Sequence, residues 1–456
     1  MGRRWKMRGD PGQRTRSGIA RTVNERLGRG LILHRRWDPL ELFFPYVLFM
    51  TNGLFCVIIS IMISKNIKSL VESPSAGVIR KMFEEGAVLK QKYGEDKVYD
   101  FSLGNPDLDP PKAVFDEIKA VAQDTSHNCH GYMPNAGYPF ARQAMADKSA
   151  KEQGVPVPKE CIVMAVGAAG ALNSALKALL NPGDEVVVPC PYFTEYDHYI
   201  HNHGGEIVRV KTKSDFGLDP QTIKAALNEK TAAIIINSPN NPSGRIYSDE
   251  EIQAVVDVLK EHGKKTGRLP YIICDEPYRA ITYGKKVSAV FPKYEYSVVV
   301  TSFAKNLSLP GERIGYICVN PACPEAKDFI AAAVFATRVL GYVNAPAFFQ
   351  KVIAKTWDCE CDYSLYEKRR NELIEIMEYA GLEYAMPEGA FYLFVKVPEG
   401  WNDDDLAFTN HLKNYNILCA PGSAFGGAGW FRIAYCVSEQ TILNSKEAFY
   451  KAAHER

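Results

Sequence analysis

Lys305 is the residue of this chain whose neighbours in the sequence most strongly indicate chemistry. It follows the apolar run 296–303, in a loop of small and turn-forming residues that extends to Gly315. Ser302 and Arg313 flank it with groups that bind anions, and a nearby cation lowers the pKa of an ammonium group. Such an amine is suited to forming a Schiff base with a carbonyl, although most lysines are only solvated loop residues.

The carboxylate pair Asp275 and Glu276 is the second candidate. Asp275 comes directly after the apolar run 271–274, and Glu276 follows it. A carboxylate at the end of such a strand is expensive to bury unless a cation pairs with it. Asp275 is the better assignment for an acid that faces a cationic ligand, and Glu276 is the competing one.

Three further segments carry groups suited to anions or polar ligands. The Gly-rich turn 167–170 separates a strand-like run from a helical one, so its backbone N–H groups could face a phosphate, although helix caps look similar. Asn241 lies in the Pro/Gly turn 237–244, at the edge where open α/β sheets bind ligands. Arg432 follows the flexible run 421–429, and its guanidinium suits either a substrate carboxylate or a surface ion pair.

These residues need a scaffold in which strands and helices alternate. Short apolar runs typical of strands occur at 161–166, 185–188, 206–210, 232–237, 271–275, 297–302 and 314–319. Helix-length segments separate many of them, which predicts an α/β fold with a mostly parallel sheet covered by helices on both faces. After residue 346, a long helical stretch precedes shorter strand patterns at 383–385, 390–397, 417–420 and 431–434. This second pattern predicts a smaller α+β domain.

Length and composition agree with this division. A chain of 456 residues is long for one core, so two domains are expected. We predict a large domain over 101–345, a small domain formed by 65–100 with 346–456, and residues 1–64 outside the catalytic fold. The net charge of +1 gives no general attraction to nucleic acid or to an anionic membrane.

The cysteines and histidines indicate neither disulfides nor a metal. The eleven cysteines are scattered without a CxxC pair, which favours buried free thiols in a reducing compartment. The histidines at 198, 201 and 203 do not have a standard zinc spacing, and no cysteine or carboxylate pair completes a set. We therefore expect no metal site.

The run 301–315 resembles the cofactor-lysine motif of the class I and II pyridoxal-phosphate aminotransferases, which belong to the fold-type I aspartate aminotransferase superfamily. The resemblance extends from about residue 69 to the C-terminus, and several motifs occur in the order of the family: 167–170, 189–193, 237–244, 271–278 and 301–315. It implies the fold-type I architecture and pyridoxal 5′-phosphate as the cofactor.

The resemblance also implies how the cofactor ring is held. Lys305 bonds to the aldehyde of the cofactor, and Asp275 rather than Glu276 faces the ring nitrogen. Tyr278 and Asn241 donate hydrogen bonds to the phenolate oxygen, and the peptide bond after Asn241 is expected to be cis.

The remaining roles concern the ring face, the phosphate and the substrate. By the same resemblance, Tyr192 stacks on the ring, and Arg432 binds the substrate carboxylate opposite Gly104 and beside Asn241. The phosphate is bound by backbone and side-chain groups and, from the neighbouring subunit of a homodimer, by a tyrosine. These groups are Ala168, Ala169, Ser302, Arg313 and, from the neighbour, Tyr132.

The expected reaction is transfer of an amino group from an amino acid to a 2-oxo acid by a ping-pong mechanism. One alternative is another reaction of the same cofactor on this fold, such as β-elimination or decarboxylation, because function resides in the site rather than in the fold. A second alternative is a cofactor-sensing transcription regulator. It is less favoured because residues 1–41, although basic, are too short and irregular for a helix-turn-helix domain.

Residues 42–64 contain no charged side chain and are long enough to cross a bilayer. The segment includes Pro45 and the turn-forming residues 51–53, and the family-like region needs nothing before about residue 64. We therefore expect translation to begin at Met62 and the enzyme to be cytoplasmic. A membrane anchor through 42–64 is the alternative, and it would be the only contact with a membrane.

Overall fold

A computed structural model describes residues 63–72 and 78–455 of the chain. The chain divides into two compact units, Met1–Glu72 and Ser73–Arg456, and the described part of the first unit contains helix α2 (Lys65–Glu72). Over the described residues, no helix has the length and apolar character needed to span a membrane. The candidate segment 42–64 lies almost entirely outside the described residues.

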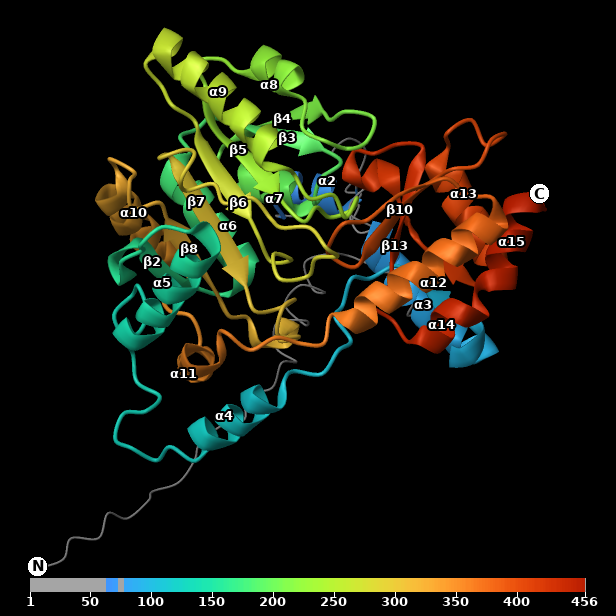
Figure 1. Cartoon of the computed structure of the whole chain (residues 1–456), viewed down its shortest axis with the longest axis horizontal. Helices are drawn as coiled ribbons and strands as arrows, with labels where there is room; N and C mark the ends of the chain where they lie inside the picture. The colour runs from blue at the N-terminus through green and yellow to red at the C-terminus, as the bar shows by residue number, and fades with distance from the viewer. Residues whose placement is uncertain (1–62, 73–77, 456) are drawn as a thin grey trace, which may run out of the picture. The chain divides into compact units, whose positions relative to one another are not determined.

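A seven-stranded sheet forms the centre of the second unit (Figure 1). Its strand order is β2-β8-β7-β6-β5-β3-β4, and within this sheet β8 alone runs antiparallel to its neighbours. The mostly parallel α/β fold is therefore confirmed. The strands are β2 (Ile162–Ala165), β3 (Glu185–Cys190), β4 (Glu206–Lys211), β5 (Thr231–Asn237), β6 (Tyr271–Asp275), β7 (Ser297–Ser302) and β8 (Gly315–Val319).

Helices surround this sheet (Figure 1). Helix α9 illustrates the residues that begin and end a helix. Ser248 and Glu251 make a reciprocal capping box at its start, and Gly267 ends it in the left-handed conformation. The helices of this region are α4 (Lys112–Ala122), α5 (Pro139–Gln153), α6 (Gly167–Leu179), α7 (Glu195–Asn202), α8 (Pro220–Ala226), α9 (Asp249–Thr266), α10 (Ala326–Val339) and α11 (Ala347–Thr356).

The remaining elements form a smaller α+β arrangement. One sheet has the order β12-β13-β10-β9, and β1 pairs in parallel with β11. The strands are β1 (Tyr99–Asp100), β9 (Tyr384–Ala385), β10 (Tyr392–Lys396), β11 (Ile417–Leu418), β12 (Ala420–Pro421) and β13 (Trp430–Ala434). The helices are α3 (Val78–Tyr93), α12 (Ser364–Ala380), α13 (Asp405–Leu412), α14 (Glu439–Asn444) and α15 (Lys446–His454). Single 3₁₀ turns occupy 95–97, 159–161, 310–312, 413–415 and 422–425.

Two clusters of buried apolar side chains hold these arrangements together. The first fills the space around the seven-stranded sheet and includes Ile234, Ile272 and Ile353. The second lies between β10, β13 and helices α12 and α15, and includes Phe391 and Phe431. Helix α11 packs in the first cluster and α12 in the second, while the domain boundaries expected from the sequence stay a prediction.

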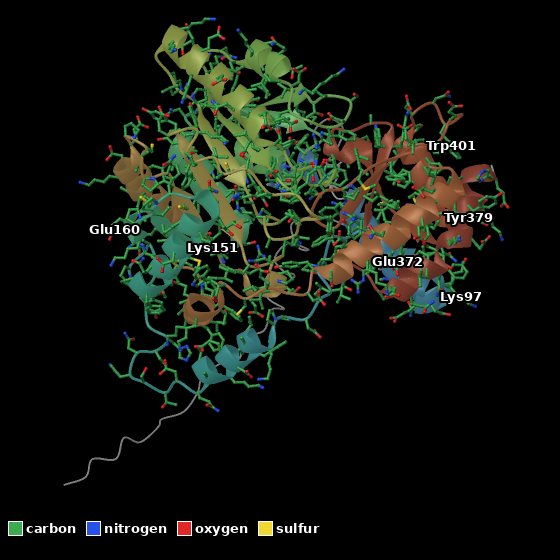
Figure 2. The ribbon with its side chains drawn as sticks, in the orientation of Figure 1. Lys97, Lys151, Glu160, Glu372, Tyr379 and Trp401 are labelled. Carbon is green, nitrogen blue, oxygen red and sulfur yellow. The ribbon has the colours of Figure 1, made fainter. Side chains whose placement is uncertain are left out.

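Polar and charged side chains cover the outside of both arrangements (Figure 2). Lys151 and Glu160 are exposed side chains in the region of the seven-stranded sheet, and Tyr379 is an exposed side chain of α12. The ten cysteines in the described part of the chain are unpaired, and most are buried. Among the described residues, no three His, Cys, Asp or Glu side chains form a group that could hold a metal ion.

Candidate active site

The candidate residues converge where β5, β6 and β7 end. Asn237 and Asp275 are paired across β5 and β6, and Ser302 ends β7 three residues before Lys305. The Asn237 side chain ties the strand ends together, since its amide donates to the Asp275 carbonyl oxygen (2.9 Å) and its oxygen accepts from the Asn241 N–H (2.8 Å). The carboxyl ends of parallel strands thus form the floor of the site, as expected for an open α/β sheet.

Lys305 projects from the loop after β7 towards the smaller arrangement. Its Nζ donates a hydrogen bond to the Gly104 carbonyl oxygen (2.8 Å) and lies 5.4 Å from the centre of the Phe391 ring. Burial lowers the pKa of Lys305 to about 8, with smaller contributions from Arg432 and Arg313. The sequence had suggested neighbouring cations as the cause, whereas desolvation of the ammonium is the larger effect.

Asp275 is a buried carboxylate with one oxygen unused. Its side chain is 4% exposed, and the Tyr196 hydroxyl donates a hydrogen bond to Oδ2. Oδ1 has no partner among the described residues. Burial raises the pKa of Asp275 to about 7, opposed by the bond from Tyr196. An unused acceptor of this kind is costly unless a ligand supplies a donor or a positive charge, so the site fits a protonated ring nitrogen.

Glu276 is buried to the same degree but has a cation of its own. Arg279 donates from a guanidinium nitrogen to Glu276 Oε1 (2.8 Å). Burial raises the pKa of Glu276 to about 7, and Arg279 opposes this shift. The ion pair with Arg279 favours Asp275 over Glu276 as the acid that faces a ligand.

The predicted phosphate-binding groups meet at the start of α6. Gly167 has φ +69°, and a Cβ there would come within 2.9 Å of the Arg313 guanidinium. Ala168 and Ala169 follow in the first turn of α6, where backbone N–H groups lack partners within the helix. The Ser302 hydroxyl is buried and accepts from the Ala304 N–H (3.4 Å). These positions fit an anion held by a helix N-terminus and a guanidinium.

Arg432 is held rigidly on β13. It is 3% exposed and donates to Asn241 Oδ1 (3.0 Å) and to the Ser102 carbonyl oxygen (2.7 Å). The rings of Tyr392 and Phe425 each lie 4.6 Å from its guanidinium carbon. Its Nε has no partner in the described part of the chain. A buried guanidinium with a spare donor is suited to a carboxylate ligand.

Tyr278 also lies in the site. Its ring centre is 5.9 Å from Lys305 Nζ, and burial raises its pKa well above the usual value. The peptide bond between Asn241 and Pro242 is cis, as the resemblance implied.

Two aromatic side chains that could support the cofactor ring lie beside Tyr196. The Tyr192 hydroxyl donates to Asp197 (2.9 Å) and accepts from Arg209 Nε (2.8 Å). Its ring and that of Phe193 both contact Tyr196, the partner of Asp275. Tyr192 stays a prediction for the platform, and Phe193 is a second candidate that the sequence reasoning missed.

Tyr132 lies at the surface. It is 91% exposed, more than any other large apolar or aromatic residue in the described part of the chain. Its predicted role in a neighbouring subunit therefore stays a prediction.

The sequence did not indicate two other residues of the site. Tyr196 donates a hydrogen bond to Asp275, and the Tyr392 hydroxyl is hydrogen-bonded to that of Tyr278. Neither stands in a spacing that distinguishes it from the other tyrosines of the chain.

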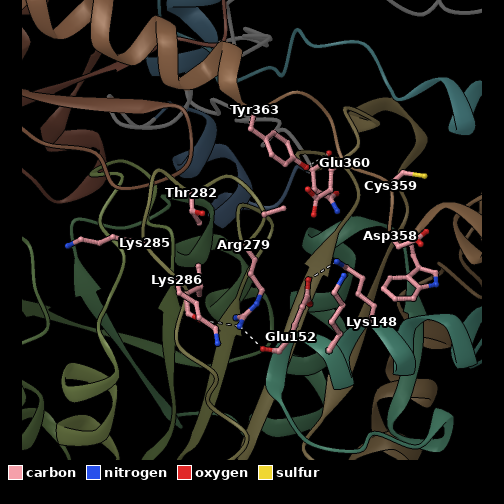
Figure 3. Close-up of a pocket in the computed structure, with 15 residues that line it drawn as sticks. Lys148, Glu152, Arg279, Thr282, Lys285, Lys286, Asp358, Cys359, Glu360 and Tyr363 are labelled. Atoms are coloured by element: carbon pink, nitrogen blue, oxygen red, sulfur yellow. Dashed lines mark hydrogen bonds and ion pairs between the residues drawn. The ribbon is translucent and has the colours of Figure 1, made fainter.

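A separate pocket of about 330 Å³ lies beside α5 and the loop before α12 (Figure 3). Asn306 contributes to its wall, but Lys305 does not. Several of its cations are paired with carboxylates of the protein: Lys148 with Glu152 (2.6 Å), Arg279 with Glu276 (2.8 Å), and Lys285 with Glu388. These three cations of the pocket therefore already have carboxylate partners.

Comparison with known proteins matches this arrangement. A profile of the family described as aminotransferase class I and II matches residues 96–449. The chain is 28% identical to the aspartate/prephenate aminotransferase of Thermus thermophilus over 85% of this chain and 97% of that protein. It is 32% identical to a probable aspartate/prephenate aminotransferase of Aquifex aeolicus over 86% of this chain and 99% of that protein.

Solved structures give the same result. A crystal structure of an aminotransferase from Eubacterium rectale has a TM-score of 0.82 and 37% identity, and covers 86% of this chain and 98% of its own. The aspartate aminotransferase of Thermus thermophilus with maleate has a TM-score of 0.74 and 27% identity, over 86% of this chain and 99% of that one.

Proposed function

Because the chain belongs to the class I and II aminotransferases, we propose that the site around Lys305 and Asp275 binds pyridoxal 5′-phosphate and transfers an amino group between an amino acid and a 2-oxo acid. The observation that carries the proposal is the buried Asp275 with its unused Oδ1, in the same site as an amine whose pKa is lowered. When bound, pyridoxal phosphate supplies a ring that accepts negative charge from the α-carbon of the substrate.

The residues of the chain have distinct tasks in this proposal. Asp275 holds a proton on the ring nitrogen, and Tyr278 with Asn241 binds the phenolate oxygen. The backbone at Ala168 and Ala169, together with Ser302 and Arg313, binds the phosphate, and Tyr192 supports the ring.

Lys305 moves the proton. Its Nζ takes the proton from the substrate α-carbon. It then delivers this proton to the carbon that receives the amino group. With a pKa of about 8, the amine can both accept and release a proton near neutral pH.

Arg432 orients the substrate. Its guanidinium is fixed by Asn241 and Ser102, and the unpartnered Nε offers a donor to the α-carboxylate. Gly104 lies beside the amine, and its carbonyl oxygen accepts a hydrogen bond from Lys305. Every amino-acid donor carries an α-carboxylate, so these contacts serve donors in general. The names of the relatives mention aspartate and prephenate, and those substrates are the relatives' own.

We propose a homodimer in which Tyr132 reaches the phosphate of the partner subunit. The 91% exposure of its ring supports this, because a tyrosine so exposed has room for a partner. A two-fold dimer would place the two sites symmetrically.

We also propose that the enzyme works in the cytoplasm. The unpaired state of the ten described cysteines supports a reducing compartment. Fractionation of the natural protein with sequencing of its N-terminus tests this, since a chain that begins near Met1 and pellets with membranes would contradict it.

Lys305→Ala tests the central assignment, with Lys327→Ala as a control at an exposed lysine of α10. Amino transfer is measured from aspartate, alanine and aromatic donors to a panel of 2-oxo acids. The first variant should lose transfer and the absorbance of the lysine-bound cofactor while staying folded, and the control should keep both. Near-native turnover of Lys305→Ala would reject the assignment.

The same assay distinguishes transfer from the other reactions of the cofactor. Release of ammonia and pyruvate without an acceptor would indicate β-elimination, and release of CO₂ would indicate decarboxylation. Either result in place of amino transfer would contradict the proposed function.

A further inference from the structure

Tyr392 connects three groups of the proposed site although it belongs to none of its motifs. It lies on β10 and is 2% exposed, and its hydroxyl is 2.9 Å from the Tyr278 hydroxyl. A Cβ on Gly104 would collide with that hydroxyl, so Tyr392 occupies the space that a side chain at 104 would need. The Gly104 carbonyl oxygen in turn accepts the hydrogen bond from Lys305.

The two hydroxyl groups carry two protons but share one hydrogen bond. Either oxygen could be the donor between them, and no other partner of either hydroxyl occurs within the described residues. One of the two hydroxyl protons is therefore buried without an acceptor in the described part of the chain. If Tyr278 donates to a ligand, as the proposed function requires, its oxygen must accept the hydrogen bond from the Tyr392 hydroxyl.

A cation lies beside the ring of Tyr392. The Arg432 guanidinium carbon lies 4.6 Å from its ring centre. Burial raises the pKa of Tyr392 to about 12, and Arg432 opposes this shift. For Tyr278, burial and the contact with Tyr392 raise the pKa well above its usual value, and Arg432 opposes this shift as well. When Tyr392 donates to Tyr278, its hydrogen bond polarises the next one in the chain.

We propose that Tyr392 is a positioning residue: its hydroxyl donates to the Tyr278 oxygen, directs the Tyr278 proton towards the phenolate oxygen of the cofactor, and sets the position of Gly104 beside Lys305. The proposal rests on the proposed function of the site.

Tyr392→Phe tests the hydroxyl while keeping the ring beside Arg432. Tyr435→Phe is the matched control, because the Tyr435 hydroxyl also makes a buried contact with another tyrosine, Tyr283 (3.1 Å). Neither Tyr435 nor Tyr283 is a residue of the proposed site. Both variants are prepared with bound pyridoxal phosphate, and the absorbance of the cofactor is followed against pH.

In Tyr392→Phe, the midpoint of the absorbance change should move to higher pH by roughly 0.2 to 0.6 of a pH unit. The reason is that a phenolate oxygen with a weaker hydrogen bond retains more negative charge and holds a neighbouring proton more firmly. The kcat should fall about three- to tenfold while KM stays within about twofold, as expected for loss of one hydrogen bond with the ring retained. Tyr435→Phe should change neither quantity.

An unchanged midpoint in Tyr392→Phe, or an equal shift in Tyr435→Phe, would overturn the proposal. A rise in KM for every donor with an unchanged midpoint would also overturn it, since Tyr392 would then bind the substrate carboxylate itself. Failure of the proposed function gives a different result, because the unaltered protein would then show neither cofactor absorbance nor amino transfer.

Discussion

At the scale of single residues, the site depends on charged side chains that are buried without a full set of partners. Asp275 has an unused oxygen, Arg432 an unused nitrogen, and Lys305 a lowered pKa. Each feature is unfavourable for the protein alone and becomes favourable when a ligand supplies the missing partner. Stability and function are therefore expected to conflict at these positions.

Asp275→Asn should show this conflict. The raised pKa means that the native state binds a proton more tightly than the unfolded chain, so stability falls as pH rises from about 4 towards 7. In the cofactor-free protein, the variant should therefore gain about 1–3 kcal/mol at pH 8 relative to the natural protein, and this gain should shrink towards pH 4. Amino transfer should nevertheless fall at least about 100-fold, because the neutral amide cannot hold the ring proton. Thermal unfolding against pH and steady-state kinetics measure the two effects.

Asp405→Asn is the matched control. This aspartate is equally buried, but its oxygens accept from the Ser423 N–H (2.7 Å) and the Gly429 N–H (3.3 Å). The amide would place a donor against one of these N–H groups, so stability should fall by about 1–3 kcal/mol at pH 8. A loss of stability in Asp275→Asn like that of the control would refute the argument. Unchanged turnover would move the role to Glu276 or elsewhere.

Arg432→Ala should raise KM for every amino-acid donor by about 100-fold, since each donor loses charge-assisted hydrogen bonds to its α-carboxylate. The measurement is KM for aspartate, alanine and aromatic donors. A defect limited to one donor would show that Arg432 recognises a side chain instead.

At the scale of elements, the site is formed by strand ends and by one helix N-terminus. The strands at 271–275 and 297–302 have the predicted bounds, and both precede candidate residues. The predicted strand 417–420 is divided instead, because Leu418 pairs with Asp100 and Ala420 pairs with Arg432. The chain changes from one sheet to the other at Cys419. The helical stretch after 346 is likewise two helices, α11 and α12, which pack in different clusters.

Gly167→Ala tests the start of α6. The substitution strains the backbone at φ +69° and places a Cβ against Arg313. Affinity for pyridoxal phosphate should fall by about 10- to 100-fold, because displacement of Arg313 costs charge-assisted hydrogen bonds to the phosphate. Cofactor binding is measured by titration of the cofactor-free protein.

Gly154→Ala separates strain from displacement. Gly154 ends α5 with the same φ of +69°, and a Cβ there meets nothing within 4 Å. This control should lose about 1 kcal/mol of stability from the left-handed conformation and keep its cofactor affinity. Equal loss of affinity in both variants would show that the contact with Arg313 is irrelevant.

At the scale of the whole molecule, the proposed dimer makes each site dependent on two chains. Lys305 would come from one subunit and Tyr132 from the other. The exposure of Tyr132 makes this dependence open to a direct test.

Mixing two inactive variants provides that test. Lys305→Ala and Tyr132→Ala homodimers are each expected to have little activity. After subunit exchange, each mixed dimer would contain one site with both defects and one native site, so about a quarter of the natural activity should return. Exchange is verified by mass spectrometry, and the separate variants treated identically are the control. No recovery in verified mixed dimers would contradict a shared site.

The sequence by itself determined the order of strands and helices, the mostly parallel fold and the family, because strand and helix periods and the turn after each strand are local properties of the chain. The identity of Lys305 as the central candidate also came from its immediate neighbours. The tertiary structure decided which acid carries its own cation, since Glu276 pairs with Arg279 whereas the Asp275 side chain accepts a hydrogen bond from Tyr196. It also brought Tyr392 to Tyr278 across 114 residues. Burial and hydrogen bonding between distant segments depend on packing, and no spacing in the sequence records them.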